Sequence, residues 1–274
     1  MFVKPDTLFL IGYSKEASML KKINLAFIII LLITATVTYF LRNNYKNISA
    51  ISPETLKPPI QKAIRDLTTI TFTKDQYEYV LTPLFSYEIN ALITHEMDYR
   101  LFSIYKRDSV FPLDLCLIWG ENISGGIFKD RSLAFSQDMR YCSYSYPGRL
   151  NFNNNEFSNN HLIVNDPEIE KKISSLSTGD QIKIKGKLVN VSATNLGQPG
   201  EFDPEYFQIN SSTQREDSGV GACEVIYVES IDILEKGNPI LQQIFQVSFL
   251  SLISLLALNI LMFVIGIFIE GYRH

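Results

Sequence analysis

Residues 178–188 read TGDQIKIKGKL, and they open the stretch 178–234 that decides the fold. Ile182, Ile184 and Leu188 alternate with lysines in this segment. A two-residue period of this kind is typical of a β-strand with one buried face and one solvent-facing side. The opening segment therefore predicts a half-buried strand.

A second strand is predicted at the end of the same stretch. Residues 224–234 read EVIYVESIDIL and carry apolar residues on both faces, which favours a more central position. Residues 211–223, SSTQREDSGVGAC, form the polar loop before it, and Gly219 and Gly221 permit a tight turn there. The whole stretch is thus expected to belong to one β-rich domain.

Earlier segments predict more strands and a first short helix. Residues 85–93 alternate apolar and polar side chains, so they predict the clearest half-buried strand. Pro83 lacks a backbone donor and is expected to separate this strand from the one before it. Residues 113–119 are apolar enough for a central strand or a buried turn, and the spacing of apolar residues over 60–67 predicts a short helix.

Another short helix is predicted before residue 179. Asp166 suits the N-cap, Pro167 suits the first helical position, and Gly179 is expected to end the helix. The resulting fold class is mainly β, an antiparallel barrel or sandwich of OB-like kind with one short helix. Such folds carry many functions, so this prediction names no substrate.

Two uncharged apolar runs, residues 23–41 and 245–269, are long enough to cross a bilayer. They are expected to flank a linker and the β-rich domain. The first run follows a long leader without a clear cleavage site, which favours an uncleaved signal anchor over a cleaved signal peptide. The predicted segments are a leader, a first span, a linker, a β domain, a second span and a tail: 1–22, 23–41, 42–67, 68–236, 245–269 and 270–274.

Basic residues predict the orientation of these spans. Four lysines precede the first span and Arg273 follows the second, whereas Arg42 and Lys46 weigh against this arrangement. We therefore expect a two-pass plasma (inner) membrane protein with both termini cytoplasmic and the central domain extracytoplasmic, on the periplasmic side. Asn259 lies within the second span and is either a contact between the two spans or between protomers, or a tolerated lone amide.

The charge balance excludes one class of partner. The 274 residues carry a formal net charge of −4. A chain without a Lys/Arg stripe lacks the electrostatic surface that nucleic acids require. The expected partners are the lipid bilayer and a membrane or envelope protein, or a second copy of the chain.

The chain contains several short motifs: YVLTPL (79–84), DYR (98–100), PLDL (112–115), WG (119–120), SNNHLI (158–163), GD (179–180), SSTQREDSG (211–219) and GACE (221–224). Together they resemble the motifs of a family of bacterial membrane-anchored envelope proteins. The resemblance covers about residues 77–234. It departs at Tyr206–Ile209, where family members carry tryptophan-rich residues. It implies an envelope location. No activity is established for this family, so the resemblance implies no catalytic residue.

The three cysteines, Cys116, Cys142 and Cys223, all fall in the predicted outer domain, where a disulfide is permitted. Three pairings are open, and Cys142 with Cys223 is our first expectation, with Cys116 as a buried small apolar residue. The chain has no CxxC motif. We therefore expect no redox motif, no metal site and no cofactor.

Two functions follow from the polar loop. Arg215, Glu216, Asp217 and Ser218 form a charged loop on a β scaffold, which favours a non-enzymatic protein that binds a partner through these residues. The alternative is an envelope hydrolase. It would use Cys223 or Ser218 as nucleophile and Asp217 or Glu224 as orienting acid, with His161, otherwise a packed residue, as base.

Overall fold

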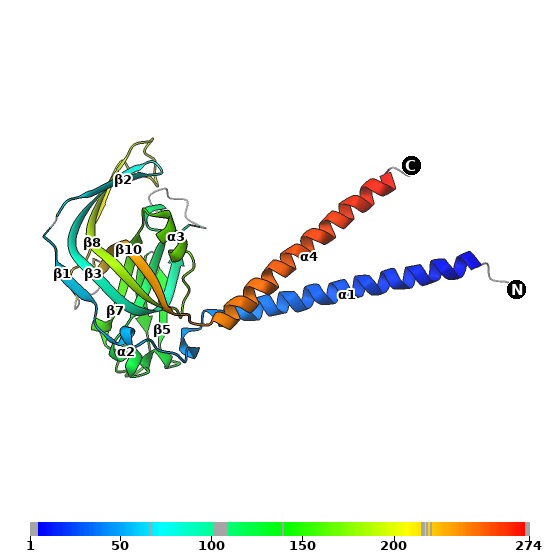
Figure 1. Ribbon diagram of the computed structural model, residues 1–274, viewed down its shortest axis with the longest axis horizontal. Coiled ribbons are helices and arrows are strands. Elements are labelled where there is room, and N and C mark those ends of the chain that lie inside the picture. Colours follow the sequence, from blue (N-terminus) through cyan, green and yellow to red (C-terminus); the bar gives the residue numbers. More distant parts are fainter. Residues whose placement is uncertain are drawn as a thin grey trace. The chain divides into compact units, whose positions relative to one another are not determined.

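The computed structural model describes residues 5–271 except residues 66, 101–108, 139, 215, 216, 218 and 220, with side chains described between residues 19 and 268. The chain divides into two compact units (Figure 1). Residues 43–238 form the β-rich unit. The terminal segments on either side form the helical unit.

The helical unit consists of α1 (Pro5–Arg42) and α4 (Pro239–Gly271). Met19–Arg42 and Pro239–Phe268 are long and apolar enough to span a membrane, which confirms the two predicted spans as candidate transmembrane helices. The first helix already begins at Pro5, so most of the predicted leader is continuous with the span.

A polar contact joins the two helices within the apolar unit. Asn24 Nδ2 donates a hydrogen bond to Asn259 Oδ1 over 2.6 Å. This confirms the predicted contact of Asn259 as one between the two spans. Ala35 and Ser248 are buried in the same unit, as expected where small residues let two helices approach.

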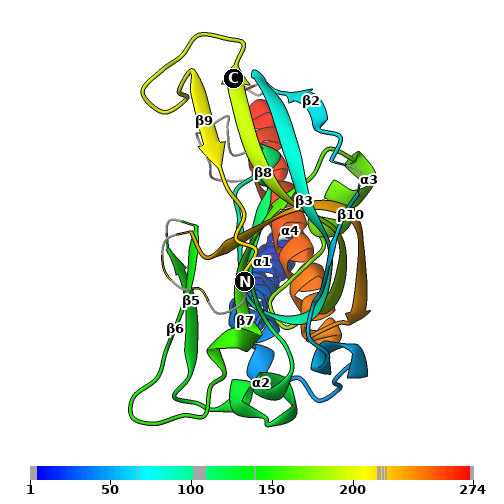
Figure 2. The same cartoon turned by 90° about the vertical axis from the view of Figure 1, so that its left-hand side faces the viewer.

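The β-rich unit is built from one eight-stranded mixed sheet and one two-stranded hairpin (Figures 1 and 2). The strands of the large sheet are β1 (Ile60–Ala63), β2 (Ile70–Lys74), β3 (Tyr77–Asp98), β4 (Leu113–Ile118), β7 (Phe157–Ile163), β8 (Gln181–Asn195), β9 (Tyr206–Ile209) and β10 (Cys223–Glu235). The hairpin strands are β5 (Ala134–Asp138) and β6 (Tyr141–Ser145).

The pairings of the five principal strands return to the strand from which they start. β3 pairs with β4, β4 with β7, β7 with β10, β10 with β8, and β8 again with β3. All these pairs are antiparallel except β7 with β10, which is parallel. The sheet is therefore mixed, whereas the sequence predicted an antiparallel one. A parallel pair requires a crossover connection, and α3 (Pro167–Ile173) lies in the chain between β7 and β8.

The opening stretch behaves as predicted. In β8, Ile182, Ile184 and Leu188 are buried, and the lysines between them are half-buried or exposed. Asp166 caps α3 by accepting hydrogen bonds from the backbone N–H groups of Glu168 and Ile169. The helix itself ends at Ile173, before the predicted end at residue 179.

Two local predictions are wrong. Pro83 lies inside β3 and does not divide it, because the pairing of β3 with β8 shifts register between Pro83 and Phe85. A β-bulge of this kind tolerates a residue without a backbone donor. Residues 60–63 form strand β1 against β3 instead of a helix, since the edge of β3 offers four pairing partners.

Glycine 186 is required by the close approach of β8 and β10. A Cβ at this position would lie 2.0 Å from the carbonyl oxygen of Tyr227. We expect Gly186→Ala to lower the free energy of unfolding by about 2–3 kcal/mol, because the strands must separate to admit the methyl group. Trp119, the single tryptophan, is buried and reports urea unfolding of the full-length protein by fluorescence. Gly200→Ala is the matched control, since nothing lies within 4 Å of its Cβ position, and equal stability of the two variants would contradict this account.

Candidate thiol site on β4, β7 and β10

The register of three adjacent strands gathers polar side chains on one face of the large sheet. Asp114 on β4 lies opposite His161 on β7, and Cys223 on β10 lies opposite Asn159, also on β7. Directly opposed residues point to the same face of a sheet, as do residues two apart on one strand. These four side chains therefore share a face, while neighbouring apolar residues such as Leu115 point into the main core.

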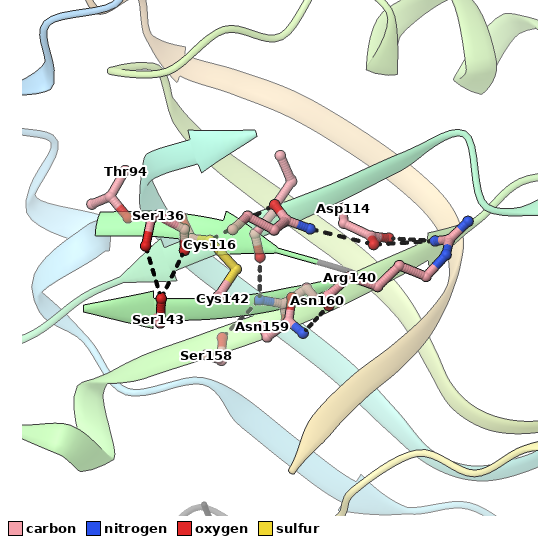
Figure 3. Close-up of a disulfide and its surroundings, with 12 residues drawn as sticks. Thr94, Asp114, Cys116, Ser136, Arg140, Cys142, Ser143, Ser158, Asn159 and Asn160 are labelled. Atoms are coloured by element: carbon pink, nitrogen blue, oxygen red, sulfur yellow. Dashed lines mark hydrogen bonds and ion pairs between the residues drawn. A yellow bond between two sulfur atoms is a disulfide. The ribbon is translucent and has the colours of Figure 1, made fainter. Parts of the chain in front are cut away.

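Asp114 is fully buried and has two cationic neighbours. His161 Nδ1 lies 2.9 Å from Asp114 Oδ1, although the angle at Nδ1 departs from that of a good hydrogen bond. Arg140 Nη1 lies 3.2 Å and 3.1 Å from the two carboxylate oxygens (Figure 3). Gln137 Nε2 also donates to Oδ2 over 3.4 Å. A buried carboxylate needs such partners, because its desolvation is otherwise uncompensated.

The hairpin of β5 and β6 brings Arg140 to this carboxylate. Arg140 has a backbone φ of +71°, the left-handed conformation of a tight turn between the two strands. Its guanidinium carbon lies 3.9 Å from the ring centroid of Tyr99 and 5.4 Å from that of Phe111. Aromatic contacts of this kind fix the planar guanidinium, so the turn positions the charge precisely enough to pair with Asp114.

Cys223 presents a buried free thiol to the same cluster. Asn159 Nδ2 donates to Cys223 Sγ over 3.0 Å and to the carbonyl oxygen of Arg140 over 2.6 Å. His161 is a diagonal neighbour of Cys223 on the same face, because Cys223 pairs with Asn159 and Val225 pairs with His161. A buried thiol with an imidazole and an amide beside it is the arrangement expected of a sulfur nucleophile.

The ionisation of His161 follows from these neighbours. Burial lowers the pKa of His161, but the Asp114 carboxylate and the Cys223 thiol outweigh burial and raise this pKa from 6.5 to about 9. The imidazole is therefore protonated near neutral pH. It lies between a carboxylate and a sulfur, as the middle group of a Cys–His–Asp arrangement.

The disulfide differs from the predicted pair. Cys142 bonds to Cys116 with the Cα atoms 5.6 Å apart (Figure 3), so the expected Cys142–Cys223 bond is wrong, as is the expectation that Cys116 is a simple buried apolar residue. The reason is the position of the β5–β6 hairpin, which brings Cys142 next to Cys116 on β4. Cys223 lies two strands away from Cys116, because β7 with its Asn159 separates β10 from β4.

A pocket of about 420 Å³ opens onto the thiol. This volume lies in the range of small-molecule sites. The residues that matter for its chemistry are three aromatic rings, an amide, a carboxylate and the thiol: Tyr141, Tyr144, Phe157, Asn159, Asp217 and Cys223. The hairpin supplies one wall and β7 and β10 supply the floor.

The structure brings together only part of the predicted site. Asp217 lines the pocket and its carboxylate accepts a hydrogen bond from the Ser212 hydroxyl. Arg215, Glu216 and Ser218 lie outside the described residues. Cys223 and His161 are diagonal neighbours on β10 and β7, which suits the hydrolase alternative, but the acid that contacts His161 is Asp114.

The sequence contained one signal for Asp114. It is a charged residue within the apolar run Leu113–Ile118, where burial requires a partner.

Groups of three or more His, Cys, Asp or Glu side chains arranged to hold a metal are absent from the described residues. No protein-family model, curated protein or solved structure matches this chain.

His161 also makes stability depend on pH. Its pKa in the folded protein, about 9, exceeds the ordinary 6.5. The ion pair is therefore fully stabilising below about pH 6.5, and its contribution is lost as pH rises through about 9. We expect the free energy of unfolding to fall over this window by no more than about 3 kcal/mol.

Urea unfolding of the full-length protein, followed by Trp119 fluorescence at several pH values, measures this slope. His161→Gln removes the titrating group and should flatten the profile over the same window. An unchanged slope in this variant would assign the pH dependence to other groups.

Proposed function

We propose that this chain is a two-pass envelope membrane protein whose β domain carries out thiol-dependent acyl transfer or hydrolysis. The observation that carries the proposal is the placement of the Cys223 thiol in a pocket, diagonally across the β7–β10 pair from His161, which in turn lies 2.9 Å from the buried Asp114. A nucleophile, a proton carrier and an orienting acid are the minimum set for this chemistry. The sequence favoured a non-enzymatic protein, and the geometry favours the alternative.

The reaction follows the roles of these three groups. The Cys223 sulfur attacks a carbonyl carbon, and the π electrons of the carbonyl move to its oxygen. When this intermediate collapses, the bond to the leaving group breaks, and His161 donates its proton to that group. Water or another acceptor then attacks the thioester carbon and gives a proton to His161. The carbon–sulfur bond breaks, and the sulfur leaves as the thiolate with which the cycle began. Asp114 holds the imidazole in place and stabilises its positive charge throughout.

We further propose that the domain is an OB-like barrel on the outer side of the membrane. The returning strand pairings, the parallel β7–β10 pair and the position of α3 between β7 and β8 support this topology. The lysines before the first span and the envelope-protein motifs support the outer location, with both termini cytoplasmic and the first span uncleaved. This placement implies a substrate in the envelope, within reach of a domain that is anchored to the membrane.

A second function, binding of a protein partner, is supported by the loop between β8 and β9. Leu196 and Phe202 are exposed there, and Tyr206 is exposed at the start of β9, beside acidic residues. Exposed apolar side chains that gather on a loop are typical of interaction surfaces. Crosslinking in intact membranes is expected to join a stable partner, or a second copy of the chain, to this loop and to the loop that carries Asp217. A strictly monomeric, solitary protein would contradict this second function.

Loss of the thiol tests the proposed chemistry. Cys223→Ser preserves size and hydrogen bonding, so we expect it to accumulate in membranes at the wild-type level. It should nevertheless fail to restore the phenotype of a strain that lacks the gene. His161→Ala should fail in the same way. Full restoration by a folded Cys223→Ser protein would overturn the proposal.

A further inference from the structure

We propose that Asn159 is the oxyanion donor of the thiol site and that its substrates are therefore carbonyl compounds, namely amides, esters or thioesters. This inference rests on the proposed function and specifies its substrate class. Disulfides, peroxides and alkyl groups also react with thiols, but they develop no oxyanion on a carbon bound to the sulfur. A donor aimed at that oxygen is useful only for acyl chemistry.

The orientation of the Asn159 amide is fixed by its partners. Amide nitrogen and oxygen are distinguished by their hydrogen bonds. The carbonyl oxygen of Arg140 can only accept a hydrogen bond, so the amide atom 2.6 Å from it is the nitrogen Nδ2. One hydrogen of this NH₂ group is directed to Arg140. The second is available for Cys223 Sγ, 3.0 Å away.

The same hydrogen can follow the charge as it moves from sulfur to oxygen. In a tetrahedral intermediate the oxyanion is two bonds from Sγ. An amide nitrogen already in contact with the sulfur is therefore near the distance of about 3 Å at which such donors act. Asn159 is 93% buried, since 7% of its surface is exposed, and it lines the pocket. It is also held by the Arg140 carbonyl, so little reorganisation is needed during the reaction.

Two electrophiles separate this role from a structural one. Cys116 and Cys142 are bonded to each other, so Cys223 is the one thiol among the three cysteines and reacts without competition. p-Nitrophenyl acetate acylates it through an oxyanion and releases p-nitrophenolate. Iodoacetamide alkylates the same sulfur by displacement of iodide, without an oxyanion. Both rates are measured on the full-length protein in detergent, and the rates of Cys223→Ser are subtracted.

We expect Asn159→Ala to lower the acylation rate about 100-fold while changing the alkylation rate by less than about 3-fold. In Asn159→Leu the new side chain has nearly the volume of asparagine but lacks the donor, so this variant should change the two rates as Asn159→Ala does. It serves as the test if the alanine variant fails to fold. Asn160→Ala is the matched control. Its amide donates to Leu115 and Ser158 and makes no contact with the sulfur, so the ratio of the two rates should remain that of the wild type.

Equal losses of both rates in the Asn159 variants would assign Asn159 a structural or general activating role and overturn the inference. Unchanged rates would also overturn it. A different outcome bears on the proposed function itself. If wild-type Cys223 is alkylated but is not acylated above the Cys223→Ser background, the acyl-transfer proposal fails together with the role of Asn159.

Discussion

Asp114→Ala is expected to destabilise the β domain by about 3–5 kcal/mol. The substitution leaves the buried His161 and the Arg140 guanidinium without their shared carboxylate. Loss of one partner from a buried charge cluster is more harmful than loss of the whole cluster. The measurement is urea unfolding of the full-length protein, reported by Trp119 fluorescence.

Asp114→Asn is the informative companion variant. It keeps the shape of the side chain but removes the charge, so it should lose less stability than the alanine variant. It also removes the main attraction that raises the pKa of His161, and burial should then draw this pKa down. Acylation of Cys223 near neutral pH is expected to fall by about 10²–10⁴-fold. If Asp114→Ala changed stability by less than about 1 kcal/mol, the cluster would not be the buried unit described above.

Removal of the Cys116–Cys142 disulfide is expected to lower the free energy of unfolding by about 3 kcal/mol. The cysteines are 26 residues apart in the sequence, so the bond limits the freedom of a substantial loop in the unfolded chain. The bond also ties the β5–β6 hairpin to β4. Since the hairpin carries Arg140 and one wall of the pocket, the Cys116→Ser/Cys142→Ser protein should also acylate more slowly.

Two controls make this prediction specific. Cys223→Ser leaves the disulfide intact and should keep nearly wild-type stability. Peptide mapping without reduction should recover Cys116 joined to Cys142. Recovery of a Cys142–Cys223 peptide, or equal stability of the double variant and the wild type, would contradict the described hairpin arrangement.

The features that the sequence predicted are those with local causes. The alternation in residues 182–188 reflects one buried face of β8, and the Asp166 cap needs only the next few backbone N–H groups. The two spans follow from length and absence of charge. A hydrogen-bond contact was one of the interpretations of Asn259, because a polar side chain in an apolar helix is stabilised by a polar partner. Asn24 is that partner.

The features that escaped prediction depend on strand register. Asp114 and His161 are 47 residues apart in the sequence, and only the pairing of β4 with β7 places them opposite each other. The pairings of β7 with β4 and with β10 place Asn159 between Cys116 and Cys223, and Cys116 bonds instead to Cys142 of the hairpin. Pro83 was misinterpreted because a bulge is a tertiary event, set by the path of β8 along β3.

The central claim is that His161 activates Cys223, and the pH dependence of Cys223 alkylation tests it most directly. The rate of iodoacetamide labelling is measured on full-length wild type and on His161→Ala from about pH 5 to about pH 10. We predict that near neutral pH the wild-type thiol reacts at least about 10-fold faster than the thiol of the variant. Superimposable rate profiles for the two proteins would contradict the account.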